Sequence, residues 1–218
     1  MPWRFLLGLA LTAAAGGVDA VSFIRFGAVY ASFMSGNTVQ IGLHVATFEA
    51  GPLGLFMALV ATFMLGGFVG SILTAKTGRW SLSAVLLLET VAVGSAFLFE
   101  VRHGPILATM ALLSFAMGAQ NNLVVLVRGA NPGTTFVTGT AFRCADAVAQ
   151  RVLGRDPAGA WRLHLIVWLS FAGGAALGAL AQAALADLSL APFTALMVFL
   201  LICATAGQAG AAKSTSTA

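Results

Sequence analysis

Residues 52–75 read PLGLFMALVATFMLGGFVGSILTA, a stretch of 24 residues without one charged side chain. A transmembrane helix needs about 20 mainly apolar residues to cross the hydrocarbon core of a bilayer. Apolar residues follow one another here instead of alternating with polar ones, which favours a helix over a strand of a membrane barrel. The stretch therefore predicts a membrane-spanning helix.

Five other segments are similarly long and mainly apolar, at residues 5–24, 81–99, 105–127, 163–186 and 190–210, with one carboxyl residue each in the first two. Over the whole chain, 59% of the residues are hydrophobic and 8% are charged, whereas soluble domains carry roughly 25% charged residues. So few charges cannot cover a water-facing surface. We therefore expect an all-α integral membrane protein with about six transmembrane helices, in which residues 1–218 form a single transmembrane domain.

Two stretches, residues 27–49 and 129–153, are only moderately apolar, rich in hydroxyl groups and interrupted by glycine. They align at a separation of 103 residues, so that Phe33-Met34-Ser35-Gly36-Asn37 matches Phe136-Val137-Thr138-Gly139-Thr140. Further along, Gly66-Gly67 matches Gly173-Gly174. The shared order predicts two internal repeats, at about residues 5–99 and 105–210, each with one glycine-broken motif segment.

The basic residues indicate how the chain is oriented in the membrane. If both motif segments are re-entrant and the N-terminus is cytoplasmic, nine of the eleven Lys and Arg residues lie inside, and only Arg25 and Arg102 lie outside. If both segments cross completely, Lys76 and Arg79 move outside, against the positive-inside rule. The bias favours six crossings with both termini cytoplasmic. The second repeat is then inverted relative to the first, as in many transporters.

The motif Phe33-Met34-Ser35-Gly36-Asn37-Thr38 followed by Gly42, and the second motif from Thr134 to Asp146, carry a family resemblance. Together with Gly118-Ala119-Gln120-Asn121, they resemble the YoaK-like family of bacterial membrane proteins, which is defined by a domain of unknown function. The resemblance covers nearly the whole chain. It implies a multi-pass protein of the bacterial inner membrane, and it implies no particular activity or substrate.

The two motifs are the first candidate site. Ser35-Gly36-Asn37-Thr38 and Thr138-Gly139-Thr140 each combine glycine with side chains that favour helix N-caps. A helix that starts at each motif would direct free N–H groups and the positive end of its dipole into a shared space. Two such ends near the bilayer midplane would suit an anion or a carboxylate. Alternatively, these residues only allow close packing and cap buried helix ends.

Polar side chains inside or beside the predicted spans add further candidates, because ionisable groups are costly in a bilayer. They are two carboxyl groups, one charged pair and two amides: Asp19 and Glu89, Arg143 and Asp146, Asn121 and Asn122. Each carboxyl group is either a protonatable coupling group or a neutral acid that binds a neighbouring helix. The charged pair is either functional or a structural salt bridge. The amides either line a polar path or hold helices together.

These features favour a small secondary transporter or permease for a small solute, with an anion among the options. A non-transporting membrane subunit or sensor is the alternative, and an intramembrane enzyme is the second alternative. We expect no enzyme activity, because no nucleophile or metal stands beside a base in a known pattern, and no cofactor. The expected partners are membrane lipid and the solute, with association of identical chains left open. Nucleic acid is not expected, because Lys and Arg form no cluster.

Overall fold

The computed structural model describes residues 2–128, 137–155 and 159–216, and every regular element in this part of the chain is helical. The elements are α1 (Pro2–Phe26), α2 (Met34–Thr47), α3 (Ala50–Thr77), η1 (Gly78–Trp80), α4 (Ser81–Val101), α5 (Ile106–Arg128), α6 (Val137–Val152), α7 (Trp161–Leu185), η2 (Ala186–Leu188) and α8 (Ala191–Ser216). The predicted all-α class is confirmed.

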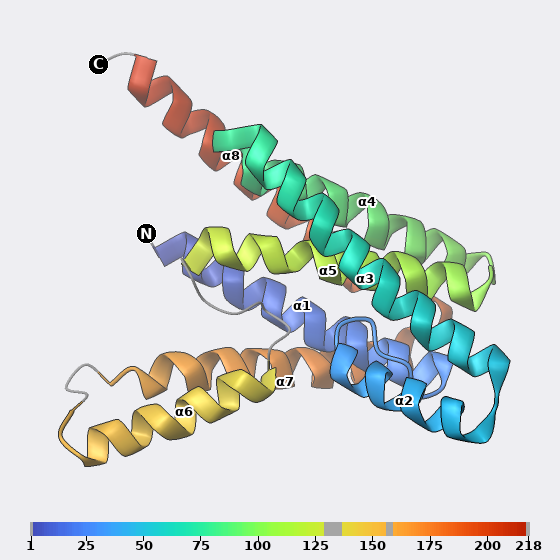
Figure 1. Ribbon diagram of the computed structural model, residues 1–218. Coiled ribbons are helices and arrows are strands. Elements are labelled where there is room, and N and C mark those ends of the chain that lie inside the picture. Colours follow the sequence, from blue (N-terminus) through green and yellow to red (C-terminus); the bar gives the residue numbers. More distant parts are fainter. Residues whose placement is uncertain (1, 129–136, 156–158, 217–218) are drawn as a thin grey trace.

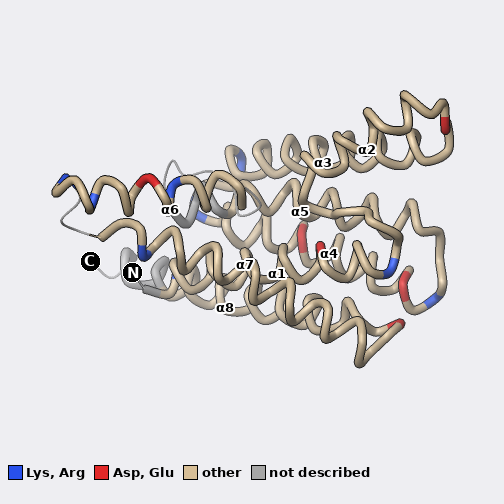
Figure 2. The backbone as a smooth tube through the Cα atoms, turned by 90° about the horizontal axis from the view of Figure 1, so that it is seen from below, with Lys and Arg blue, Asp and Glu red and all other residues tan. Residues whose placement is uncertain are grey.

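Within the described ranges, four helical stretches are long and apolar enough to cross a membrane. They are Trp3–Phe26, Ala50–Val101, Trp161–Leu188 and Ala191–Gly210. The second stretch comprises two separate helices, α3 and α4, with η1 between them. Figure 2 shows that the coloured charged positions are sparse along the helices, and that many of them lie near helix ends. This distribution agrees with the predicted integral membrane protein.

The long helices run in roughly one direction, and the two chain termini lie at the same end of the bundle (Figure 1). Helix α1 packs against α7, α3 packs against α5, and α4 packs against α5 and α8. The two shorter helices lie on the outside, where α2 packs on α3 and α6 packs on α7. In Figure 1, α2 and α6 each start near the middle of the bundle and run towards opposite ends.

Glycine allows the backbones of α3 and α5 to approach each other closely. A Cβ atom added at Gly66 would overlap the carbonyl oxygen of Phe115, and one added at Gly118 would overlap that of Phe63. Small residues at such interfaces let membrane helices gain van der Waals contact where lipid removes the hydrophobic driving force. The interface between α3 and α5 therefore depends on these two glycines.

Close backbone packing at glycine residues also joins α1 to α7. A Cβ atom at Gly174 would overlap the carbonyl oxygen of Ala13, and one at Gly16 would overlap that of Phe171. At Gly173, by contrast, an added Cβ would meet nothing within 4 Å. Of the two adjacent glycines in α7, only Gly174 thus faces α1 at backbone distance.

Candidate functional site

After α1 the chain turns back towards the bundle through residues 27–33. The turn uses left-handed backbone conformations at Gly27 (φ 80°) and Ala28 (φ 60°). Asp19 of α1 holds the other end of this loop, because its carboxylate accepts hydrogen bonds from the backbone N–H (2.7 Å) and the hydroxyl group (2.6 Å) of Ser32. Asp19 and Ser32 are both buried. The predicted coupling candidate Asp19 thus anchors the segment that leads into the first motif.

Asn37 of α2 closes the same loop from the other side. Its Nδ2 donates to the carbonyl oxygen of Tyr30 (2.7 Å), and its Oδ1 accepts from the N–H of Tyr30 (3.2 Å). The side chain is fully buried. Because both polar atoms of the amide are used within the protein, this arrangement favours a structural role for Asn37 over direct contact with a solute.

The neighbouring motif residues shape the start of α2. Gly36 leaves room for the ring of Phe33, since a Cβ atom at this position would lie 2.5 Å from a ring carbon. The ring of Phe33 meets that of Tyr30 edge-on, with the centroids 5.1 Å apart. The hydroxyl group of Thr38 donates to the carbonyl oxygen of Met34 one turn earlier (2.8 Å). Gly36 and Thr38 therefore serve the local conformation.

Two neighbouring cavities lie where the two motif segments meet. The first, which we call the apolar cavity, has a volume of about 410 Å³. Its lining is mainly apolar and comes from α1, the loop, α6 and α7, including Asp19, Ala20, Phe23, Ile24, Tyr30, Phe33, Val137, Thr138, Phe171 and Ala175. The second, which we call the motif cavity, has a volume of about 450 Å³ and is lined by Ser32, Phe33, Met34, Ser35, Phe63, Val137 and Thr138.

The structure brings Ser35 and Thr138, the matching residues of the two motifs, to the same motif cavity. Phe33, Val137 and Thr138 line both cavities, so the two cavities lie next to each other. Gly139 and Thr140 follow in the first turn of α6, are half-buried, and do not belong to either lining. Thr134, Thr135 and Phe136 of the second motif lie outside the described residues.

The two candidate amides of α5 lie away from these cavities. Asn122 donates through Nδ2 to the carbonyl oxygen of Gly67 (3.1 Å) and accepts through Oδ1 from the hydroxyl group of Ser71 (2.9 Å). Asn121 donates to the carbonyl oxygen of Met117 within its own helix (2.9 Å). Asn122 therefore joins α5 to α3, which agrees with the alternative that the amides hold helices together.

The remaining candidates belong to neither cavity lining. Glu89 is fully buried in α4, and no donor in the described part of the chain hydrogen-bonds to its carboxyl oxygens. Asp146 is exposed on α6 and accepts a hydrogen bond from Gln150 at 3.4 Å. Arg143 lies three residues earlier on the same helix, and its pairing with Asp146 stays a prediction.

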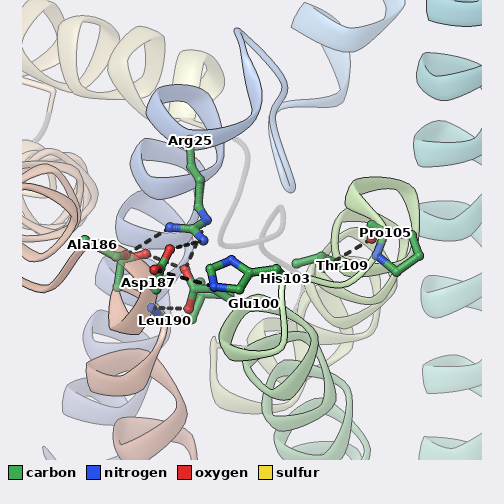
Figure 3. Close-up of polar contacts among 9 residues, drawn as sticks. Arg25, Glu100, His103, Pro105, Thr109, Ala186, Asp187 and Leu190 are labelled. Carbon is green, nitrogen blue, oxygen red and sulfur yellow. Dashed lines mark hydrogen bonds and ion pairs between the residues drawn. The ribbon is translucent and has the colours of Figure 1, made fainter.

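A polar cluster that the sequence analysis did not identify lies at one end of the bundle (Figure 3). Arg25, in the last turn of α1, donates to the carboxylate of Asp187 (2.7 Å) and to the carbonyl oxygen of Ala186 (3.1 Å). Its Nε lies 3.6 Å from a carboxylate oxygen of Glu100. The cluster thus joins α1 to the end of α4 and to the connection between α7 and α8.

Glu100 is also the anchor for the start of α8. Its carboxylate accepts hydrogen bonds from the hydroxyl group of Ser189 (2.6 Å) and from the N–H of Leu190 (3.1 Å). The sequence signal for this cluster is that Arg25, Glu100 and Asp187 each directly follow a predicted apolar segment. The partner Asp187 lies 162 positions from Arg25, too far for any local pattern to reveal the contact.

Comparisons with known proteins agree with the predicted family resemblance. The model of the family described as "Protein of unknown function (DUF1275)" matches residues 7–206. Over 192 residues the chain is 32% identical to the UPF0700 transmembrane protein RA0705 of Rhizobium meliloti (strain 1021), which covers 86% of this chain and 81% of that protein. No solved structure matches the chain. The expected membership in an uncharacterised membrane-protein family is confirmed.

Proposed function

We propose that this chain, which belongs to the DUF1275 family of proteins of unknown function, is a small transporter or permease of the bacterial inner membrane. The observation that carries the proposal is the pair of adjoining cavities at the meeting point of the two motif segments. Membrane helices gain stability by close packing, so a purely structural subunit has no use for such space. A transporter, by contrast, needs space in which its solute can bind.

The linings favour a solute with an apolar body and one polar or anionic end. Aromatic and aliphatic side chains dominate the apolar cavity. The motif cavity includes the first residues of two helices, Met34 and Ser35 of α2 and Val137 and Thr138 of α6. Helix N-termini offer free N–H groups and a positive dipole end, which attract a carboxylate. No side chain caps the start of α2, but the N–H groups of Met34 and Gly36 already donate to the carbonyl oxygens of Ser32 and Phe33, so the attraction there rests mainly on the helix dipole.

The proposed path has six crossings, α1, α3, α4, α5, α7 and α8, with α2 and α6 as re-entrant helices. This topology is supported by the position of both termini at one end of the bundle and by the opposite directions of α2 and α6 (Figure 1). With the termini in the cytoplasm, the end that carries Arg25 and Arg102 faces the outside. The excess of basic residues then lies inside, as the positive-inside rule requires.

We further propose that residues 5–99 and 105–210 form an inverted repeat. The contact of Gly66 in the α3–α5 pair resembles that of Gly174 in the α7–α1 pair, and the contact of Gly118 resembles that of Gly16. These correspondences are shifted by one residue from the sequence match, which pairs Gly66 with Gly173. Contacts between helices depend on which face a residue occupies, so they define the register more directly than residue identity does.

The ends of α4 and α8 add a second pair of similar contacts. Glu100 near the end of α4 binds Ser189 at the start of α8. Gln208 of α8 binds the hydroxyl group of Ser83 and the carbonyl oxygen of Arg79 at the start of α4. In both cases a long side chain near one helix end satisfies polar groups where the partner helix begins. This reciprocity is what a two-fold repeat would produce.

A binding and uptake experiment tests the proposed function. Thermal unfolding of the purified protein in detergent is measured with straight-chain monocarboxylates of increasing length and with the matching primary alcohols. We expect the carboxylates to stabilise the protein more than the alcohols do, and a carboxylate at 100 times its Kd to stabilise it by about 2.7 kcal/mol relative to the unliganded protein. Uptake of the best carboxylate into proteoliposomes then separates transport from binding alone.

One variant pair links the effect to the apolar cavity. Ala175→Phe would fill the cavity from α7, because Ala175 belongs to its lining. Ala176→Phe, the matched control, adds the same ring at the next position, which is exposed. Stabilisation and uptake should be lost in the first variant and kept in the second. Stabilisation without uptake would favour a sensor or subunit, and equal stabilisation of both variants would place the solute elsewhere.

A further inference from the structure

The three charged residues Arg25, Asp187 and Glu100, which we call the ionic latch, join α1, α4 and the α7–α8 connection at one end of the helix bundle (Figure 3). The Arg25 side chain points from α1 towards both carboxylates, with hydrogen bonds to Asp187 and Ala186 and an ion pair with Glu100. The Asp187 side chain is 52% exposed, whereas that of Glu100 is fully buried. Water can therefore compete for one partner of the guanidinium group and not for the other.

The latch lies beyond the glycine contacts of the α1–α7 pair, in the direction of this end. The glycine contacts of this pair run as far as Gly17 and Gly178, where an added Cβ at Gly178 would overlap the backbone of Gly17. Arg25 follows about two helical turns later, and it contacts the residues that directly follow α7. Backbone packing thus joins the middle of the two helices, and charged side chains join their ends.

The apolar cavity lies along the stretch of α1 between these two kinds of contact. Asp19, Ala20, Phe23 and Ile24 all belong to its lining, and Arg25 is the next residue. The loop that begins after α1 supplies two further wall residues, Tyr30 and Phe33. A displacement of the end of α1 would therefore move two sides of the cavity together.

We infer that the ionic latch is the gate of the apolar cavity at this end of the bundle, which the proposed topology assigns to the outside. When Arg25 separates from Asp187 and Glu100, the end of α1 moves away from η2 and the cavity opens to solution. The inference rests on the proposed function, because it names the gate of the same path.

The related α3–α5 pair supports this assignment by contrast. There, Asn122 is joined to Gly67 and Ser71 by neutral hydrogen bonds next to the glycine contacts. The strength of neutral hydrogen bonds depends little on salt or on nearby charges. Exposed ion pairs, by contrast, are weakened by salt and can be broken by competing ions. A charged and partly exposed contact therefore suits the end of the α1–α7 pair, which separates. A neutral interhelical contact suits the α3–α5 pair, which stays packed.

Space for the movement is also present. A cavity of about 350 Å³ lies beside the latch, with Arg25, Glu100 and Asp187 in its lining together with His103 and Thr109. The His103 ring lies 3.9 Å from the carboxylate of Asp187. The guanidinium group can thus leave its partners without displacing packed side chains.

Pulsed electron paramagnetic resonance tests the latch directly and needs no solute. Spin labels are attached at Ile24→Cys and Leu188→Cys, two exposed positions on either side of the latch, after Cys144 and Cys203 are replaced by serine. The distance distribution of the purified, folded protein is compared with that of Asp187→Asn and Arg25→Gln. Arg102→Gln is the matched control, because it removes a charge at the same end and keeps the backbone contact of Arg102 with Glu100, while no side-chain hydrogen bond or ion pair of the described residues joins Arg102 to the latch.

We expect Asp187→Asn to raise the population of a longer-distance state about two- to fivefold, the factor that a partly exposed ion pair contributes. Asp187→Glu should keep the parent distribution. An unchanged distribution in Asp187→Asn and Arg25→Gln would overturn the gate, and so would an equal change in Arg102→Gln. A failed carboxylate screen would count against the proposed solute and would not alter this measurement.

Discussion

Asp19 offers the sharpest test of how the first motif is held in place. Its carboxylate accepts two hydrogen bonds from buried Ser32, at 2.7 Å and 2.6 Å. Asp19→Leu keeps similar bulk but leaves the N–H and the hydroxyl group of Ser32 without this acceptor. Each buried unsatisfied group costs about 1–3 kcal/mol. Since two groups are affected, we expect a loss of about 4 kcal/mol in the free energy of unfolding.

Asp19→Asn separates hydrogen bonding from charge. The amide oxygen can accept from the N–H of Ser32, and the amide nitrogen can donate to the hydroxyl oxygen, so both groups stay satisfied. We expect a loss of only about 1 kcal/mol, the difference between a charge-assisted and a neutral hydrogen bond. Asp146→Asn, at an exposed position of α6, is the control and should change stability by about 0.5 kcal/mol or less.

Reversible unfolding by denaturant in mixed micelles, followed by circular dichroism, measures these differences. The anchoring argument requires the leucine variant to be clearly less stable than the asparagine variant. If both variants are equally destabilised, the negative charge itself matters, and the proton-coupling role predicted for Asp19 gains support. If neither variant loses stability, the contact with Ser32 does not hold the loop.

Three further predictions address packing and topology. Gly174→Ala should destabilise the protein by about 2 kcal/mol or more, because the new Cβ would overlap a backbone oxygen of α1. Gly173→Ala should be nearly neutral, because its Cβ would meet open space. Thermal unfolding of both variants tests this difference. Asn122→Leu should cost about 1–3 kcal/mol by breaking the α3–α5 hydrogen bonds, and carboxylate binding should persist in a titration. Reporter fusions after Ala50 and after Leu188 should both read periplasmic, and a cytoplasmic signal at Ala50 would contradict the re-entrant α2.

The sequence predicted the helices well because lipid leaves few alternatives. The apolar segments 81–99 and 105–127 correspond to α4 (Ser81–Val101) and α5 (Ile106–Arg128) within two residues at each end. A backbone in hydrocarbon must satisfy its own hydrogen bonds, so a long apolar run becomes a helix. The placement of Ser35 and Thr138 at one cavity was likewise accessible from the sequence, because the internal match between residues 33–37 and 136–140 relates the two motifs to each other.

The roles of individual polar side chains were not accessible in the same way. An amide such as Asn37 has the same sequence signature whether it binds a solute or braces a loop. Its contact with Tyr30 exists because the chain turns at Gly27 with a positive φ and folds back on α2. The position of Asn122 depends on helix register, since a rotation of one residue turns an amide by about 100° around the axis. The roles of both amides therefore depend on tertiary contacts, which no local sequence pattern encodes.

The contacts around the first motif imply an order of events for gate opening. The loop of residues 27–33 is tied to α1 through Asp19 and to α2 through Asn37, and both side chains are buried. The latch at the root of the loop is the one of these three contacts that includes a strongly exposed partner, Asp187. Exposed partners are released at lower cost than buried ones, because water replaces the lost contact, and the buried partner Glu100 keeps its hydrogen bonds from Ser189 and Leu190 when Arg25 leaves. The latch therefore opens first, and the end of α1, the loop and the start of α2 move together while their internal hydrogen bonds stay intact.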